Sequence, residues 1–313
     1  MAGHPSDLTG SPPPWPRWQA RWALLRPGFL GVSLSAVLVG LASHINAEPG
    51  SWIRALAVLV LLALVHAAAN AWNDLQDARS GADAANTERM APFSGGSRAL
   101  IEGGLAAGDG LRVVALLAAL SLLGGCVLVA TSQPALLGVC VAGGVLAWAY
   151  SAPPLSLMRR GWGEVCVAAC WALIPLGAHL TMGGALAAQA ATLAISPALG
   201  ACAILVAANL ADLSADRLHG KHTLVVRLGA QRGVGLFWLL QIGLWIWSLV
   251  CLVTAAWPSI AWITLLALPP SLISLRAAMA SLQDRVALAR AIPVAIQASL
   301  LHNLLLAFSL WWG

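Results

Sequence analysis

Charged residues are scarce in this chain. Only 9% of its 313 residues are Asp, Glu, Lys or Arg, against roughly 25% in soluble domains, which excludes a soluble protein. What the chain has instead is a series of apolar runs near the ~20 residues needed to cross a bilayer. These runs lie at residues 24–44, 52–72, 111–131, 134–150, 163–183, 191–211, 233–255, 257–275 and 292–312. The sequence therefore predicts an all-α, multi-pass transmembrane bundle of about nine helices.

Cysteine pairs with the spacing of a zinc site or a redox motif are also missing. All six cysteines lie in or beside apolar runs, and Cys166 and Cys170 are four residues apart. Small buried apolar residues are the better interpretation, and a disulfide framework is not expected. No stretch is typical of a soluble domain either. We expect a proline-rich disordered tail over residues 1–17 and one transmembrane domain over 18–313, in which the bundle itself is the functional unit.

The 17 Lys and Arg residues are unevenly placed along the chain. If the N-terminus is cytoplasmic, all of them except Arg54 fall on the cytoplasmic side of the predicted spans, as the positive-inside rule requires. The net charge of +5 then reflects topology in the lipid bilayer, and it gives no reason to expect a nucleic-acid partner. The sequence predicts a protein of the inner (cytoplasmic) membrane and leaves its oligomeric state open.

Two short stretches repeat each other where an apolar run ends. Each begins with an asparagine, followed by a polar side chain at +3, an aspartate at +7 and a glycine at +11. The first contains Asn70, Asn73, Asp77 and Gly81, and the second contains Asn209, Asp212, Asp216 and Gly220. At 3.6 residues per turn these offsets span about 80° of arc, so each set lies on one helical face. Four spans separate the two stretches, which predicts a parallel internal repeat with both motifs on the cytoplasmic side.

Both stretches are rich in aspartate. The candidate metal ligands, five of the chain's twelve acids, are Asp74, Asp77, Asp83, Asp212 and Asp216. Two facing carboxylate clusters repel each other unless cations lie between them. Mg²⁺ prefers oxygen ligands and bridges to substrate phosphates, so the pattern predicts a magnesium site and a phosphorylated substrate. The amides of Asn70, Asn73 and Asn209 either complete such a site or donate to phosphate.

Basic residues in the same connections are candidate phosphate binders. They are Arg89, Arg98, Lys221 and Arg227, since Arg offers a planar fork for phosphate oxygens and Lys a point charge. Gly95 and Gly96, beside Arg98, allow backbone N–H groups to approach an anion. His66 lies four residues before Asn70 on the same helix face, and either contacts a substrate or packs in the core.

Taken together, these motifs resemble the UbiA superfamily of intramembrane aromatic prenyltransferases. The segment from Asn73 through Asp77 and Gly81 to Asp83 resembles the first aspartate-rich motif of that family. Asp212-x-x-x-Asp216, followed by Gly220-Lys221-x-Thr223-Leu224-x-Val226-Arg227-Leu228-Gly229, resembles the second. Arg26-Pro27-x-Phe29-Leu30 and Tyr150-Ser-Ala-x-Pro154-x-x-Leu157 are similar to further family positions.

The resemblance implies Mg²⁺-dependent transfer of a polyprenyl group from an allylic polyprenyl diphosphate to an aromatic acceptor. Asp77, Asp216 and Asn73 would be catalytic, and Tyr150 would bind substrate. The Gly81-x-Asp83 ending resembles the branch that prenylates 1,4-dihydroxy-2-naphthoate for menaquinone, where carboxylate is lost as the prenyl group is added. The family commonly has an Asp-Arg-Pro or Asp-Arg-Thr cluster after the first motif, and this chain has Thr87-Glu88-Arg89-Met90. It is therefore open whether Arg89 or Arg98 grips the diphosphate.

Other functions are weighed beside this one. The acceptor could instead be 4-hydroxybenzoate, homogentisate, haem or chlorophyllide, within the same superfamily. A secondary transporter is a different class of protein, but transporters place their polar site near the midplane of interrupted helices, often in inverted repeats. Acids at one edge of the bundle and a parallel repeat favour the enzyme.

Overall fold

Nine apolar helical spans form the bundle over the part of the chain that the computed structural model describes, which is residues 15–44, 50–81, 86 and 89–313. Eight of them are long and apolar enough to cross a membrane, and α6 is a shorter apolar helix. In this count α1 and α2 form one span, and the short 3-10 helices Ser259–Ala267 and Arg285–Ala287 extend α10 and α11. The helices are α1 (Arg17–Leu24), α2 (Pro27–Ala42), α3 (Ser51–Ser80), α5 (Ala107–Ala130), α6 (Ala135–Ser151), α7 (Gly163–Thr181), α8 (Ala188–Leu218), α9 (Leu224–Val253), α10 (Leu268–Ala280) and α11 (Leu288–Trp312). The described residues contain no strand. The predicted all-α, multi-pass bundle is confirmed.

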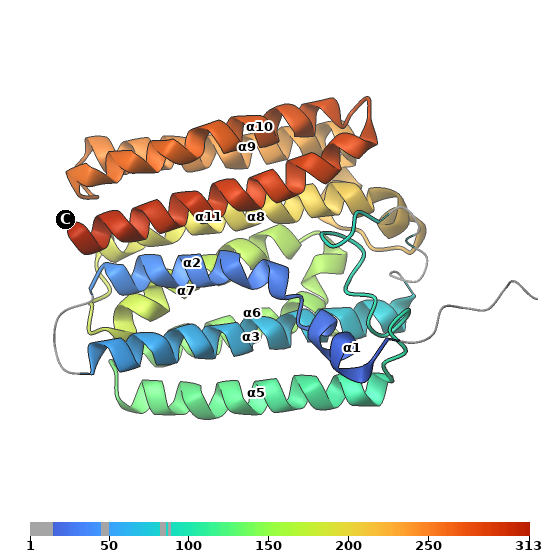
Figure 1. The fold of residues 1–313 in the computed structure, drawn as a ribbon, viewed down its shortest axis with the longest axis horizontal. Coiled ribbons are helices and arrows are strands. Elements are labelled where there is room, and N and C mark those ends of the chain that lie inside the picture. Colours follow the sequence, from blue (N-terminus) through green and yellow to red (C-terminus); the bar gives the residue numbers. More distant parts are fainter. Residues whose placement is uncertain (1–14, 45–49, 82–85, 87–88) are drawn as a thin grey trace, which may run out of the picture.

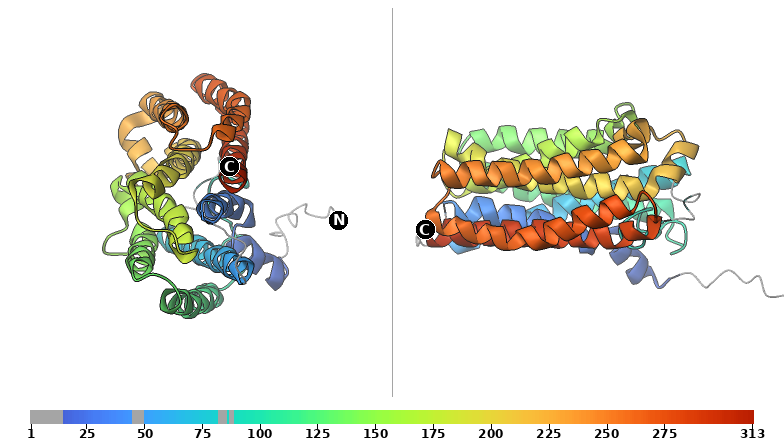
Figure 2. Two further views of the ribbon diagram at one scale, coloured as in Figure 1. Left: turned by 90° about the vertical axis from the view of Figure 1, so that its left-hand side faces the viewer. Right: turned by 90° about the horizontal axis from the view of Figure 1, so that it is seen from above.

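The long helices run side by side along the long axis of the molecule (Figure 1). Figure 2 shows them end-on in its left panel, with α5 at one edge and α10 at the other. Helix α2 packs against α3, α7 and α11, and α8 packs against α7, α9 and α11. Small residues allow close approach in such a bundle. At Gly40 of α2, for example, a Cβ atom would collide with the Pro175 carbonyl of α7.

Helix ends differ from the predicted spans in one consistent way. Helices α3 and α8 continue past the apolar runs 52–72 and 191–211 by two turns or so, to Ser80 and Leu218. The reason is that the polar residues after each run still form intrahelical hydrogen bonds, whereas hydropathy registers only the apolar part. The short helix α1, which begins at Arg17, was not predicted; residues 1–14 of the expected tail lie outside the described part of the chain.

The glycines of the repeat end both motif helices in the same way. Gly81 is the residue after α3 and has φ 76°, and Gly220, two residues beyond α8, has φ 65°. A left-handed backbone at a helix C-terminus is readily adopted by glycine, which has no Cβ. Each helix therefore stops shortly after its aspartates, at the same end of the bundle.

Candidate active site

Aspartates from the two repeats meet around one lysine. Asp77 on α3 and Asp216 on α8 are 5% and 4% exposed. The Lys221 Nζ atom lies 3.4 Å from Asp77 Oδ2 and 3.5 Å from Asp216 Oδ1. The two carboxylates, 139 positions apart in the sequence, thus share one ammonium group. We call Asp77, Asp216 and Lys221 the acid pair and its lysine.

Lys221 is the only lysine in the sequence, and its side chain is buried. It lies in the short connection between α8 and α9. Burial by itself lowers the pKa of this ammonium, but the Asp77 and Asp216 carboxylates outweigh burial and hold the pKa above its ordinary value. Lys221 is therefore positively charged at neutral pH, and its charge balances one of the two buried carboxylates beside it.

The other two described aspartates of the predicted ligand set, Asp74 and Asp212, bind the loop between α3 and α5. Asp212 accepts hydrogen bonds from Asn86 Nδ2 (2.6 Å) and from the Gly95 backbone N–H (3.2 Å). Asp74 accepts one from the Ser97 backbone N–H (2.9 Å) and lies 3.9 Å from Arg26 Nη1. These contacts attach the described part of the loop, residues 86 and 89–98, to both motif helices. We call residues 86 and 89–98 the arginine loop, because they include Arg89 and Arg98.

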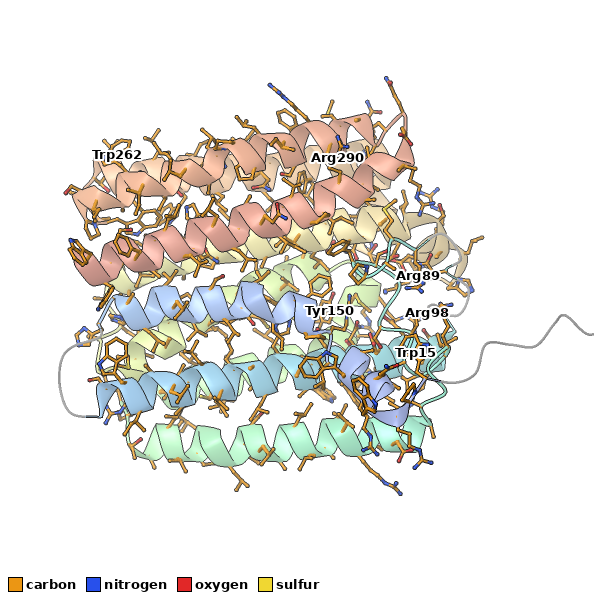
Figure 3. The ribbon with its side chains drawn as sticks, viewed as in Figure 1. Trp15, Arg89, Arg98, Tyr150, Trp262 and Arg290 are labelled. Atoms are coloured by element: carbon orange, nitrogen blue, oxygen red, sulfur yellow. The ribbon has the colours of Figure 1, made fainter. Side chains whose placement is uncertain are left out.

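Both arginines of this loop bind the same carboxylate. Arg98 Nε donates to Glu102 Oε1 at 2.8 Å, and Arg89 Nη2 donates to Glu102 Oε2 at 3.3 Å. Arg98 also has a positive φ of 63°, which is strained for a residue with a Cβ. Figure 3 shows Arg89 and Arg98 at the end of the bundle, with Tyr150 farther in along the axis. The arginines form the outer rim of the site, and Tyr150 belongs to its interior.

The amides of the repeat occupy the interior layer. Asn73 Nδ2 donates to Ser151 Oγ at 3.0 Å, and Asn70 Nδ2 donates to the Leu25 carbonyl at 3.2 Å. Asn209 Nδ2 donates to Glu164 Oε1 at 3.0 Å. These contacts join the motif helices to α1, α6 and α7, so the amides also have structural partners within the fold.

Two sequence candidates lie apart from the acid pair and its lysine. Arg227 donates to the carbonyls of His222 (3.2 Å) and Arg160 (2.8 Å), and it ties two connections together at the surface. His66 Nδ1 lies 2.8 Å from Ser33 Oγ, and its ring meets Trp171 edge to face at 5.3 Å. His66 thus lines the apolar interior.

The donor set at this end fits a hard divalent cation in chemistry. Mg²⁺ takes oxygen ligands, and Asp216 Oδ2 and Asp74 Oδ1 are buried without a hydrogen-bond partner. Among the described residues, no three His, Cys, Asp or Glu side chains gather closely enough to hold a metal ion, and the ammonium group of Lys221 lies within 3.5 Å of both Asp77 and Asp216. Asp83, the fifth predicted ligand, is outside the described residues.

Sequence reasoning missed three residues that shape the site: Asn86, Glu102 and Glu164. Asn86 and Glu102 lie in a loop with no periodic pattern, so nothing in the sequence indicates their partners. Glu164 could have been found, because a carboxylate at the start of an apolar run is costly and usually functional. Its position beside a connection hides this signal, because acids are common in connections.

Comparisons with known proteins agree with this fold. Among solved structures, a UbiA homolog from Archaeoglobus fulgidus bound to DMAPP and Mg²⁺ has the same fold, with a TM-score of 0.68 at 18% identity. The match covers 93% of this chain and 98% of that chain.

Curated relatives are more similar in sequence. The 1,4-dihydroxy-2-naphthoate octaprenyltransferase of Escherichia coli is 30% identical over 310 residues, which is 94% of this chain and 96% of that protein. The bacteriochlorophyll synthase 33 kDa chain of Cereibacter sphaeroides is 37% identical over 125 residues, or 39% of this chain and 40% of that protein. The UbiA prenyltransferase family matches residues 33–305. The chain therefore belongs to the UbiA prenyltransferase family and is a membrane-embedded prenyltransferase.

Proposed function

We propose that this enzyme transfers a polyprenyl group from an allylic polyprenyl diphosphate to 1,4-dihydroxy-2-naphthoate, with Mg²⁺ as cofactor, in menaquinone biosynthesis. The observation that carries the proposal is the convergence of Asp77 and Asp216 on Lys221 at one end of an apolar bundle. Such a site suits cations and a diphosphate at the edge of an apolar bundle, in which an isoprenoid chain is soluble.

The diphosphate is the leaving group of the reaction. When the allylic C–O bond breaks, its electron pair stays on the diphosphate, and negative charge grows there. Lys221 and Arg98 oppose that charge with fixed positive charges. Bound Mg²⁺, held by Asp77 and Asp216 with Asp74, Asp83 and Asp212 as the further predicted ligands, would supply Lewis-acid neutralisation of the diphosphate.

The carbon skeleton reacts deeper in the bundle. A ring carbon of the acceptor forms the new C–C bond with the allylic carbon, and with the naphthoate a carboxylate leaves as CO₂. The apolar helices exclude water, which would otherwise capture the allylic cation as an alcohol. Tyr150, Asn73 and Asn209 are the polar side chains of this layer, and we assign substrate contact to them.

The identity of the acceptor rests on the relatives. The naphthoate enzyme of Escherichia coli covers nearly the whole chain, and the Gly81-x-Asp83 ending of the first motif points the same way. The partial likeness to the Cereibacter protein favours a tetrapyrrole acceptor as the second candidate. We also propose that the site faces the cytoplasm from the inner membrane, since the charged connections lie at that end.

The test is product formation by purified enzyme. We expect a prenylated, decarboxylated naphthalenediol, identified by mass, from 1,4-dihydroxy-2-naphthoate and an allylic polyprenyl diphosphate with Mg²⁺. Chlorophyllide and 4-hydroxybenzoate are offered in parallel reactions. Product from one of these alone would change the acceptor, and the absence of Mg²⁺-dependent diphosphate release with every acceptor would refute the proposal.

A further inference from the structure

Glu164 is a buried carboxylate with an unused oxygen. It is 5% exposed, and Asn209 Nδ2 donates to its Oε1 at 3.0 Å. Its Oε2 is buried and has no hydrogen-bond partner, and no ion pair among the described residues includes it. Burying a carboxylate without a cation or full hydrogen bonding is costly, so a bound molecule that donates to Oε2 would remove a real penalty.

The position of Glu164 relative to the acid pair is set by α8. Asn209 precedes Asp216 by seven residues, which is two turns and about 10 Å along the helix axis. Glu164, bonded to Asn209, therefore lies inward of the acid pair and its lysine. A molecule whose diphosphate rests on Lys221 has its reacting carbon on this inward side.

Tyr150 connects the level of the acid pair with the level of Glu164. Its phenol lies in the electrostatic fields of Lys221, Glu164 and Asp77, and its ring borders Gly163, the residue before Glu164. Figure 3 shows Tyr150 inward of Arg89. The phenol and the Glu164 carboxylate thus lie, with the amides of Asn73 and Asn209, between the acid pair and the apolar part of the bundle.

The same face of α7 continues as an aromatic wall. Trp171 follows Glu164 by seven residues, so the two side chains lie on one helical face. The Trp171 ring meets His66 edge to face, and its Nε1 is buried without a partner. An aromatic ring bound here would have the unpaired Glu164 Oε2 atom at one end and the rings of Trp171 and His66 beyond it.

We propose that Glu164 and Tyr150 form the subsite that binds a ring hydroxyl of the aromatic acceptor. The hydroxyl donates to Glu164 Oε2 in a charge-assisted hydrogen bond, which is stronger than a neutral one. The bond fixes the ring beside the allylic carbon and raises electron density on the ring, so that the ring carbon attacks more readily. Because like charges repel, the carboxylate of the acceptor is turned away from Glu164. This inference rests on the proposed prenyl transfer.

The experiment compares two acceptors and two enzymes. The acceptors are 1,4-dihydroxy-2-naphthoate and its analogue with one hydroxyl methylated, tested at both positions; the enzymes are the wild type and Glu164→Gln. We expect kcat/KM of the wild type to fall at least tenfold on methylation of one of the hydroxyls, because a site built to receive a hydroxyl rejects the analogue that lacks it. For Glu164→Gln, kcat/KM for the hydroxy acceptor should exceed that for the same methoxy analogue by less than threefold. The KM of the prenyl diphosphate should stay within twofold of the wild-type value.

Controls separate this role from a structural one. Steric and electronic effects of the methyl group are common to both enzymes, so only the change in discrimination reports on Glu164. Asp284→Asn, the same carboxylate-to-amide change at an exposed position between α10 and α11, should discriminate as the wild type does. Glu164→Gln with wild-type discrimination would overturn the proposal.

If Glu164→Gln does not fold, measurements on the wild-type enzyme alone still test the proposal. A wild-type enzyme that uses the hydroxy and both methoxy acceptors equally well overturns the subsite while leaving prenyl transfer standing. A wild-type enzyme that transfers to no hydroxylated acceptor overturns the proposed function, and the subsite falls with it.

Discussion

Replacement of Lys221 by methionine separates the electrostatics of this site from its chemistry. The substitution keeps the length of the side chain and removes the positive charge that Asp77 and Asp216 share at 3.4 and 3.5 Å. Two buried carboxylates are then left facing each other without a counter-charge. We expect a less stable protein when divalent cations are absent.

The size of the effect follows from burial. Breaking a buried ion pair by removing one partner costs about 3–5 kcal/mol. For a chain of 313 residues, that corresponds to a fall in melting temperature of about 5–8 °C. Free Mg²⁺ at 100 times its Kd raises the free energy of unfolding by about 2.7 kcal/mol when it binds only the folded protein. Lys221→Met should gain more from Mg²⁺ than the wild type does, because in the wild type the ammonium competes for the same carboxylates.

Thermal unfolding in detergent, with EDTA and then with excess Mg²⁺, measures both quantities. Lys221→Arg serves as the control, because it keeps the charge and should melt near the wild type in EDTA. If Lys221→Met melts within a degree of the wild type in EDTA, or if Mg²⁺ raises both melting temperatures equally, the shared ammonium is not what balances Asp77 and Asp216.

Three further outcomes follow from the same contacts. Asp77→Asn or Asp216→Asn should lower kcat by about 10²–10³-fold with an unchanged elution profile in size exclusion; turnover at the wild-type rate would remove these residues from the metal site. EDTA should abolish diphosphate release and Mg²⁺ should restore it, as followed by a phosphate-coupled assay; release that persists in EDTA contradicts the metal assignment. Arg98→Gln should raise the KM of the prenyl diphosphate about tenfold, which corresponds to the loss of one hydrogen bond to a charged group. Arg89→Gln should raise this KM less, since Arg89 is the more exposed of the two. The reverse order would assign the diphosphate to Arg89.

The fold could be read from the sequence because lipid leaves few alternatives. A backbone in hydrocarbon must satisfy its own hydrogen bonds, so apolar runs of sufficient length become helices. Even the shortest run, 134–150, corresponds to a helix, α6. Hydropathy could not reveal the kink at Gly229, where φ is 76° inside α9, or the packing order of the helices. Both depend on which small side chains meet, and an all-round apolar helix shows no preferred face.

The candidate site could be read only in part. The offsets of the repeat placed Asp77 and Asp216 on helix faces at one end of the bundle, and the structure brings both to Lys221. Spacing cannot tell which aspartate of a cluster faces the other motif and which faces a loop. That choice depends on the path of the arginine loop, which follows from contacts distant in sequence and from no local pattern.

The two motifs therefore have different contacts at the +3 position, although their spacing is the same. At +3 the first motif has Asn73, a neutral amide that bonds Ser151 inside the bundle, and the second has Asp212, which accepts from Asn86 and the Gly95 backbone. A carboxylate suits the second position, because backbone and amide donors of a loop need a strong acceptor. Asp212, which forms no ion pair with Lys221, therefore holds the arginine loop close to the first motif. Loss of Asp212 should then weaken diphosphate binding through Arg98 even if no cation ever touches that carboxylate.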